Sequence, residues 1–184
     1  MKLTLDFFGI GGPMLVGKST MAEMLSSHYK NSFIIPFAKD VKEFASQMGW
    51  NGEKDDKGRR LLQLLGTDCM RDCIDMDGWL KLWFGRVAEA IGTTLLTGIA
   101  DGKFDNMTIA VIADDLRFMN ELRLINNLGG TTILLKSTRQ QTATGIIGHR
   151  SEIGLPSTAF SCVIDNSGTR EHLASAARRV NINV

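Results

Sequence analysis

Apolar residues along this chain fall either into short apolar-rich runs or into stretches where they recur at a spacing of three or four. Apolar-rich runs of strand length occupy residues 3–8, 32–38, 107–113, 131–136 and 159–164. Helical spacing of apolar side chains is found over residues 20–29, 40–48, 59–73, 79–91, 117–128 and 170–180. Strands that alternate with helices are typical of a parallel sheet with helices on both faces. The pattern therefore predicts an α/β fold with a mainly parallel five-stranded sheet.

Three stretches follow neither pattern. Residues 50–58 and 137–157 are polar and contain glycine, so we expect loops there. Within residues 93–106, the apolar run 94–97 resembles a strand and residues 99–103 resemble a turn. We therefore expect a surface hairpin or a mobile loop over 93–106. The sequence contains no repeat and no linker, which predicts a single domain over residues 1–184.

The first predicted strand leads directly into a glycine-rich loop. Residues 12–19, GPMLVGKS, match the phosphate-loop pattern G-x-x-x-x-G-K-[ST] between a strand and a helix. Gly12 and Gly17 would let the backbone curl around a phosphate, with the N-terminus of the following helix directed at it. Lys18 would reach the β- and γ-phosphates, and the hydroxyl of Ser19 would bind Mg²⁺. The alternative is a glycine-rich turn before an ordinary helix, but the strand and helix on either side favour nucleotide binding.

A carboxylate near the Mg²⁺ is the second feature that phosphate-loop enzymes need. Asp114 and Asp115 end the predicted strand 107–113. Consecutive strand residues point to opposite faces of a sheet, so at most one of the two should face the loop. Both could instead cap the following helix.

Arginines in two places are candidates for binding phosphate groups. Arg59, Arg60 and Arg71 lie on the helix before the third strand, where a guanidinium could hold the phosphate of a mononucleotide. By composition alone, a solvated helix face is the favoured interpretation of these arginines. Arg139 and Arg150 lie in the loop 137–157, which could close over the donor and exclude water. His149 in the same loop reads as an ordinary loop residue.

Composition narrows the functional classes further. The chain has 184 residues, a formal net charge of +1 and 43% hydrophobic residues, so nothing favours nucleic acid or a membrane surface as a partner. The longest apolar runs are too short for a bilayer span or a signal peptide. Cys69 and Cys73 lie one helical turn apart, a spacing that favours two small core residues over a zinc site. We expect a cytoplasmic protein, in the host cytoplasm if a phage encodes it.

A series of short signatures resembles the bacteriophage-type deoxynucleoside monophosphate kinases, which have a phosphate-loop kinase fold. The signatures run in order over nearly the whole chain: residues 17–20 (GKST), 37–38 (FA), 42–43 (KE), Arg59, 62–63 (LQ), 66–68 (GTD), Arg71, Trp79, 115–118 (DLRF), 120–121 (NE), His149, 151–152 (SE), 165–166 (DN) and 168–169 (GT). The chain departs from the family at Met119, where proline is common, in the apolar residues of its phosphate loop and in residues 93–106, which resemble an insertion.

The resemblance implies a three-layer α/β/α nucleotide kinase fold, with an acceptor-binding helical region over about 38–92 and a lid loop over about 137–157. It also implies roles for single residues. Catalytic roles fall on Lys18, Arg117 and Arg150. Donor binding falls on Gly12, Gly17, Lys18, Ser19, Thr20, Arg139 and Asn166, with Asn166 near the base. Acceptor binding falls on Lys42, Arg59, Arg71, Trp79 and Asp115, and Mg²⁺ binding on Ser19 and Asp115, the aspartate that matches the family pattern.

The activity implied is transfer of a phosphoryl group from ATP, with Mg²⁺, to a (deoxy)nucleoside monophosphate, by a chain that could form a homodimer. Two alternatives remain open from the sequence. One is another small-molecule kinase of the same fold, such as a dephospho-coenzyme A or nucleoside kinase. The other is a nucleotide-binding switch that transfers nothing.

Overall fold

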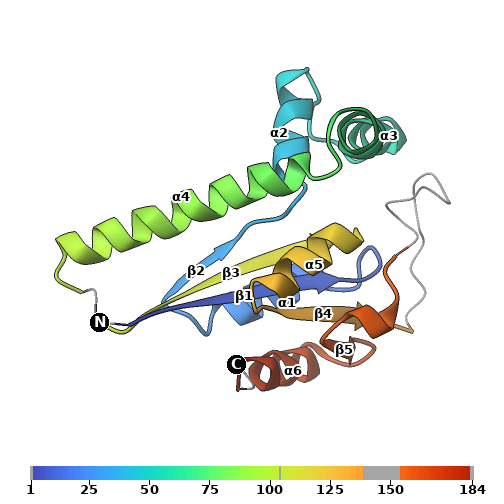
Figure 1. Cartoon of the computed structure of the whole chain (residues 1–184). Helices are drawn as coiled ribbons and strands as arrows, with labels where there is room; N and C mark the ends of the chain where they lie inside the picture. The colour runs from blue at the N-terminus through green and yellow to red at the C-terminus, as the bar shows by residue number, and fades with distance from the viewer. Residues whose placement is uncertain (1, 104, 139–153, 183–184) are drawn as a thin grey trace.

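A computed structural model describes residues 2–103, 105–138 and 154–182 of the chain (Figure 1). Its strands are β1 (Leu3–Gly11), β2 (Asn31–Ile34), β3 (Met107–Leu116), β4 (Thr131–Lys136) and β5 (Cys162–Asp165). Its helices are α1 (Lys18–Ser26), α2 (Lys39–Gln47), α3 (Asp56–Gln63), the π-helix η1 (Leu64–Ile74), α4 (Gly78–Ala100), α5 (Met119–Asn127), the short 3₁₀-helix η3 (Ser157–Ala159) and α6 (Arg170–Ile182).

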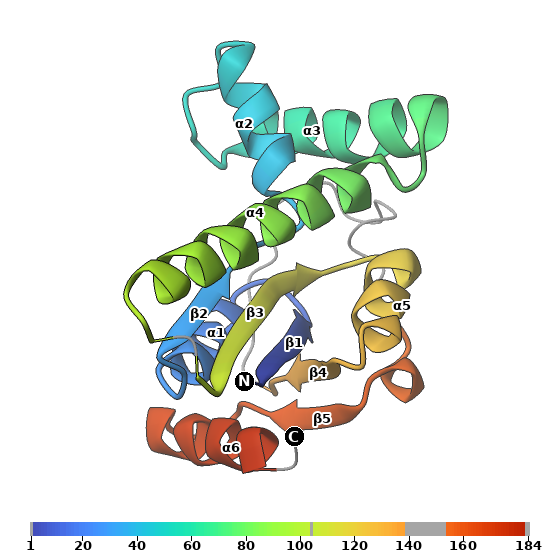
Figure 2. The ribbon, with the colours of Figure 1, turned by 60° about the vertical axis from the view of Figure 1, so that its left-hand side comes forward.

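The strands form one parallel sheet of five strands in the order β2-β3-β1-β4-β5. Helices α1 and α6 cover one face, and α4 and α5 cover the other (Figures 1 and 2). Neighbouring residues of β1 show how the sequence builds both layers, because Phe7 packs under α4 and α5 while Phe8 packs against α1 and α6. This is the three-layer α/β/α fold that the sequence predicts.

The predicted strand 32–38 is shorter in the structure, since β2 ends at Ile34. Pro36 has no N–H to donate to a sheet, and the chain leaves the sheet at this point. The N–H groups of Phe37 and Ala38 instead donate to the side chain of Asp115, at 2.7 and 2.9 Å. The end of β2 is thus fixed by a carboxylate from β3.

The expected hairpin or loop over residues 93–106 is wrong, because α4 continues through this stretch to Ala100. The hydroxyls of Thr94 and Thr97 donate to the carbonyls of Ala90 and Thr93, four residues earlier, each at 2.9 Å. The threonine hydroxyls therefore find hydrogen-bond acceptors within the helix, although threonine intrinsically prefers strands.

The predicted helix 59–73 begins earlier than expected, at Asp56, and changes from an α-helix to a π-helix at Leu64. Asp55 caps its start by accepting a hydrogen bond of 2.7 Å from the N–H of Gly58. From Leu64 onward the backbone is π-helical, and Thr67 and Arg71 are its buried residues. Cys69 and Cys73, expected in the core, are exposed instead, because the wider turn of a π-helix changes which residues face inward.

Among the helices in the described ranges, none is both long enough and apolar enough to cross a membrane.

Candidate functional site

The loop between β1 and α1 has the backbone that a phosphate loop needs. Gly12 and Gly17 have φ angles of 135° and 96°, which side-chain-bearing residues rarely adopt. A Cβ atom on Gly17 would lie 2.6 Å from Nδ2 of Asn166, so the loop also packs too closely for a side chain there. Leu15, at the tip, has a φ of 60° and is 77% exposed.

Lys18 lies in the curl of this loop. Its Nζ donates to the carbonyls of Gly12 and Pro13, at 2.9 and 2.7 Å. Because α1 begins at Lys18, the partial positive charge of the helix N-terminus adds to the lysine charge. The loop therefore presents backbone N–H groups and a cation to the same small volume, which is an arrangement suited to a polyphosphate.

The two aspartates at the end of β3 diverge, and it is Asp114 that reaches the phosphate loop. The hydroxyl of Ser19 donates to Oδ2 of Asp114 at 2.7 Å. Asp115, which the sequence placed at the metal, points the other way and accepts the two backbone hydrogen bonds from residues 37 and 38. Burial raises the pKa of Asp115, while these two hydrogen bonds act to lower it.

The chemistry of the Ser19–Asp114 pair fits Mg²⁺. A hydroxyl and a carboxylate are the hard oxygen donors that this ion prefers. Within the described part of the chain, no group of three or more His, Cys, Asp or Glu side chains could hold a metal ion. A metal beside Ser19 would therefore need phosphate oxygens and water as further ligands, as Mg²⁺ does in nucleotide sites.

Arg59 comes to the phosphate loop from α3. Its Nε donates to the carbonyl of Lys54 at 2.7 Å, and its Nη1 lies 3.2 Å from Sδ of Met14 in the loop. The residues are 45 positions apart in the chain, so the contact is made by the fold. It places a guanidinium next to the loop on the side of the acceptor-binding helical region predicted from the sequence.

Arg71 occupies a very different position. Its side chain is 4% exposed, on the buried face of η1, and is paired with the equally buried Glu121 on α5. Nη1 donates to Oδ1 of Asn120 at 3.1 Å, and the guanidinium lies 3.9 Å from the centre of the Phe118 ring. Burial raises the pKa of Glu121 to about 7, against the opposing effect of the Arg71 charge.

The other predicted acceptor-binding residues are less directly placed. Trp79 is a core residue, 4% exposed, whose Nε1 donates to the carbonyl of Gly66 at 2.9 Å. Lys42 is half-buried on α2, close enough to Asp115 for its charge to act to lower the pKa of that carboxyl. The side chain of Arg117 is exposed, and its backbone N–H donates to Glu121 at 2.8 Å.

Asn166 supports the phosphate loop from the other side. Its Nδ2 donates to the carbonyl of Val16 at 2.9 Å. Beside it lies a cavity of about 230 Å³, lined by Thr20, Asn166, Gly168, Thr169, Arg170 and Leu173. Two of the predicted donor-binding residues, Thr20 and Asn166, thus line the same small cavity next to the loop. Arg139, His149 and Arg150 lie outside the described residues.

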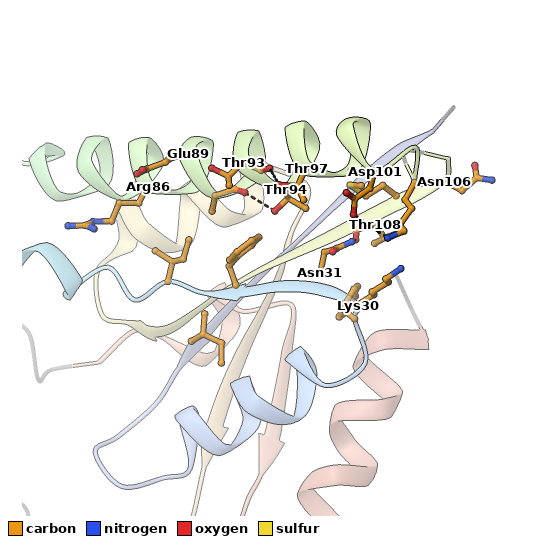
Figure 3. A pocket seen from close by; sticks show the side chains of 18 of the residues that line it. Lys30, Asn31, Arg86, Glu89, Thr93, Thr94, Thr97, Asp101, Asn106 and Thr108 are labelled. Carbon is orange, nitrogen blue, oxygen red and sulfur yellow. Dashed lines mark hydrogen bonds and ion pairs between the residues drawn. The ribbon is translucent and has the colours of Figure 1, made fainter.

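A larger cleft than the cavity beside Asn166 lies elsewhere in the structure. It has a volume of about 1080 Å³ and runs between α4 and the edge strand β2 (Figure 3). Figure 3 shows Thr93 and Thr97 of α4 on one side of it and Asn31 at the start of β2 on the other. None of residues 12–19 lines this cleft, so it is separate from the phosphate loop.

Two parts of the site escaped the sequence analysis. Which of Asp114 and Asp115 faces the phosphate loop depends on how β3 is aligned with the loop. A run of apolar residues does not reveal this alignment. Glu121 is three residues after Phe118, the residue before α5, and accepts its N–H at 3.1 Å. This is half of a capping box, but Phe118 is not the Ser or Thr that marks the motif in a sequence, so no sequence pattern signalled the buried position of Glu121.

Comparison with known proteins assigns the chain to a family. A family model described as deoxynucleotide monophosphate kinase matches residues 16–177. A deoxynucleotide monophosphate kinase of Escherichia phage RB69 is 29% identical over 123 residues, which are 66% of this chain and 43% of the relative. The chain thus spans less than half the length of that relative.

Among solved structures, the tunicamycin resistance protein of Deinococcus radiodurans has a TM-score of 0.50 at 14% identity, covering 97% of this chain and 94% of that one. At this identity the similarity concerns the fold alone. The family model, in contrast, covers residues 16–19 of the phosphate loop, the Ser19–Asp114 pair, Arg59 and the residues that line the cavity beside Asn166. The chain belongs to the deoxynucleotide monophosphate kinase family.

Proposed function

We propose that this chain transfers the γ-phosphoryl group of ATP directly to a deoxynucleoside monophosphate, giving the diphosphate and ADP. The observation that carries the proposal is the contact of Arg59 with Met14 of the phosphate loop. It brings a guanidinium from the acceptor side to the donor-phosphate site, where a transferred phosphoryl group would lie between the two substrates.

On the donor side, Lys18 releases the loop carbonyls and binds the β- and γ-phosphate oxygens. Ser19 and Asp114 hold Mg²⁺, with Asp114 in the role that the sequence suggested for Asp115. When bound, the ion neutralises negative charge on the β- and γ-phosphates. Thr20 and Asn166 border the cavity that takes the donor base, which supports their donor-binding role.

On the acceptor side, Arg59 binds the phosphate of the monophosphate, and Lys42 and Arg117 add positive charge. This acceptor is already an anionic oxygen nucleophile, so the reaction needs positioning and charge neutralisation more than a general base. Arg139 and Arg150 complete the site as arginines of the lid. The helical region 38–92 binds the acceptor, and Trp79 supports that region from its core.

The test is a coupled assay for ADP, with ATP and Mg²⁺ and each ribo- and deoxynucleoside monophosphate in turn. We expect ADP formation that depends on the acceptor and is lost by orders of magnitude in Lys18→Met. ADP that forms slowly and at the same rate without any acceptor would contradict the proposal and favour a nucleotide switch. Activity only with dephospho-coenzyme A or a nucleoside would identify a different kinase.

A further inference from the structure

The buried pair formed by Arg71 and Glu121 has no part in the chemistry proposed above, yet it is the most enclosed ionic contact described. The two side chains are 4% and 3% exposed. Burying two charges costs free energy that a good geometry has to offset. Here the carboxylate also accepts the backbone N–H groups of Arg117 and Phe118, at 2.8 and 3.1 Å.

The guanidinium is held from several directions. Its Nη1 donates to the carbonyl of Met76 at 3.3 Å and to the side chain of Asn120 at 3.1 Å, while Nη2 donates to Glu121. Phe118 packs against its face. Asn120 in turn donates to the carbonyl of Met76 and to Asp77, at 3.2 and 2.8 Å.

These contacts join three segments that are distant in the sequence. Arg71 belongs to η1, residues 76 and 77 form the turn before α4, and residues 117–121 form the corner between β3 and α5. The α3–η1 segment carries Arg59 near its other end, and it also packs against α2 and α4. Because α3 and η1 form one continuous helical segment, the anchoring of Arg71 to α5 helps to fix where Arg59 lies beside the phosphate loop.

We propose that Arg71 is a positioning residue, anchored by Glu121, which holds α3 and η1 so that Arg59 lies against the phosphate loop. This inference rests on the proposed function, because it assigns to Arg71 an indirect effect on the same reaction. It differs from the direct contact with the acceptor phosphate that the sequence suggested for Arg71.

Geometry favours the indirect role. A phosphate that reached Arg71 would have to enter a space where the side chain is 4% exposed. It would also have to displace, or lie beside, the carboxylate of Glu121, and two anions at one guanidinium repel each other. Arg59, in contrast, is only partly buried and lies next to the loop.

The experiment is a set of variants in two backgrounds. Arg71→Gln, Glu121→Gln and the double variant are assayed for kcat and for the KM of the acceptor, in the wild type and in Arg59→Gln. If Arg71 acts through Arg59, each single variant lowers kcat/KM by about tenfold or more in the wild type. The double variant is no worse than the single ones, and none has a further effect in Arg59→Gln. Arg123→Gln, at an exposed position of α5, the helix that carries Glu121, is the matched control and stays at the wild-type level.

Two results would overturn the inference. One is a loss of acceptor affinity in Arg71→Gln that persists in full in the Arg59→Gln background, while Glu121→Gln is normal; this would make Arg71 a direct ligand. The other is additive loss in the double variant. If a single variant fails to fold because one buried charge is left unpaired, the double variant, which has neither charge, is compared with the wild type in both backgrounds.

Urea unfolding of the same variants separates this inference from the proposed function. The coupling between Arg71 and Glu121 in the free energy of unfolding is independent of any reaction. An inactive wild type with strong coupling would contradict the proposed function alone. An active wild type without coupling would contradict the anchoring of Arg71 alone.

Discussion

Asp114 and Asp115 follow each other in the sequence but contact different parts of the molecule. Asp114 accepts a hydrogen bond from Ser19 in the loop-to-helix junction, and Asp115 binds the backbone where the chain leaves β2. The apolar run predicted a strand that ends in two carboxylates with opposite directions. It did not predict which carboxylate faces the loop, because that depends on how β3 is aligned with β1.

Replacing each aspartate by asparagine should separate the two tasks. Asp114→Asn keeps the shape but removes the charge next to Ser19, so we expect kcat to fall by about 100-fold or more, with normal stability. Asp115→Asn loses one acceptor for the N–H groups of Phe37 and Ala38 and should lower the free energy of unfolding by about 1–3 kcal/mol. Assays of ADP formation test the expected fall in kcat, and urea unfolding of both variants tests the expected change in stability. A large loss of kcat in Asp115→Asn, together with a loss of stability in Asp114→Asn, would indicate that Asp115 binds the metal instead.

Glu121 predicts how stability depends on pH. Its pKa is raised in the folded protein to about 7, above the ordinary value of 4.5. The folded state therefore binds more protons than the unfolded state between these values, and the free energy of unfolding should fall as pH rises from about 4.5 to 7.

Urea unfolding at several pH values tests this dependence. Glu121→Gln should show a flatter profile over the same range, and the slope that remains should come from Asp115, whose pKa burial also raises. A slope that is unchanged in Glu121→Gln would show that another group is responsible.

At the scale of single elements, α4 is the clearest case in which local preferences mislead. Threonines and glycines over residues 92–98 weaken the helical signal, so the sequence predicts an end near Ile91. The structure continues the helix because the threonine hydroxyls find acceptors one turn back. The π-helix of η1 is a similar case, since no periodicity in residues 59–73 signals the change that buries Arg71 and exposes Cys69.

The glycines of α4 give a quantitative test of this helix. A Cβ atom added at Gly85 or Gly92 would meet nothing within 4 Å. Gly85→Ala and Gly92→Ala should therefore each raise the free energy of unfolding by about 0.5–1 kcal/mol, as expected in a helix interior. Gly78→Ala is the control, because its Cβ would lie 2.7 Å from Sδ of Met70 and should destabilise the fold. No gain at either Gly85 or Gly92 would contradict a regular helix there.

At the scale of the whole molecule, the alternation of strands and helices and the position of the phosphate loop could be predicted, because both follow from local patterns. The sheet order and the contact between Arg59 and Met14 could not, because they depend on packing between distant segments. The large cleft beside β2 is also a product of packing, and its size alone would suggest a substrate site.

We expect the cleft between α4 and β2 to have no part in binding either substrate. Thr97→Trp would place a large side chain in it, more than 20 residues from α3 and η1 in the sequence, and should change the KM of ATP and of the acceptor by less than about twofold. Steady-state kinetics with a melting curve as a folding control would check this. A large rise in the acceptor KM would move the acceptor site into the cleft.

The sheet order also has a consequence for the synthesis of this protein on the ribosome. β1 emerges well before its two neighbours, β3, which begins at Met107, and β4, which begins at Thr131. At a synthesis rate of about 5–20 residues per second, about 5–20 seconds pass between the emergence of β1 and that of β3. During this time the apolar side chains of Phe7, Phe8 and Ile10 have no sheet to join. Until β3 has emerged, the nascent chain therefore exposes an apolar segment that is prone to aggregate.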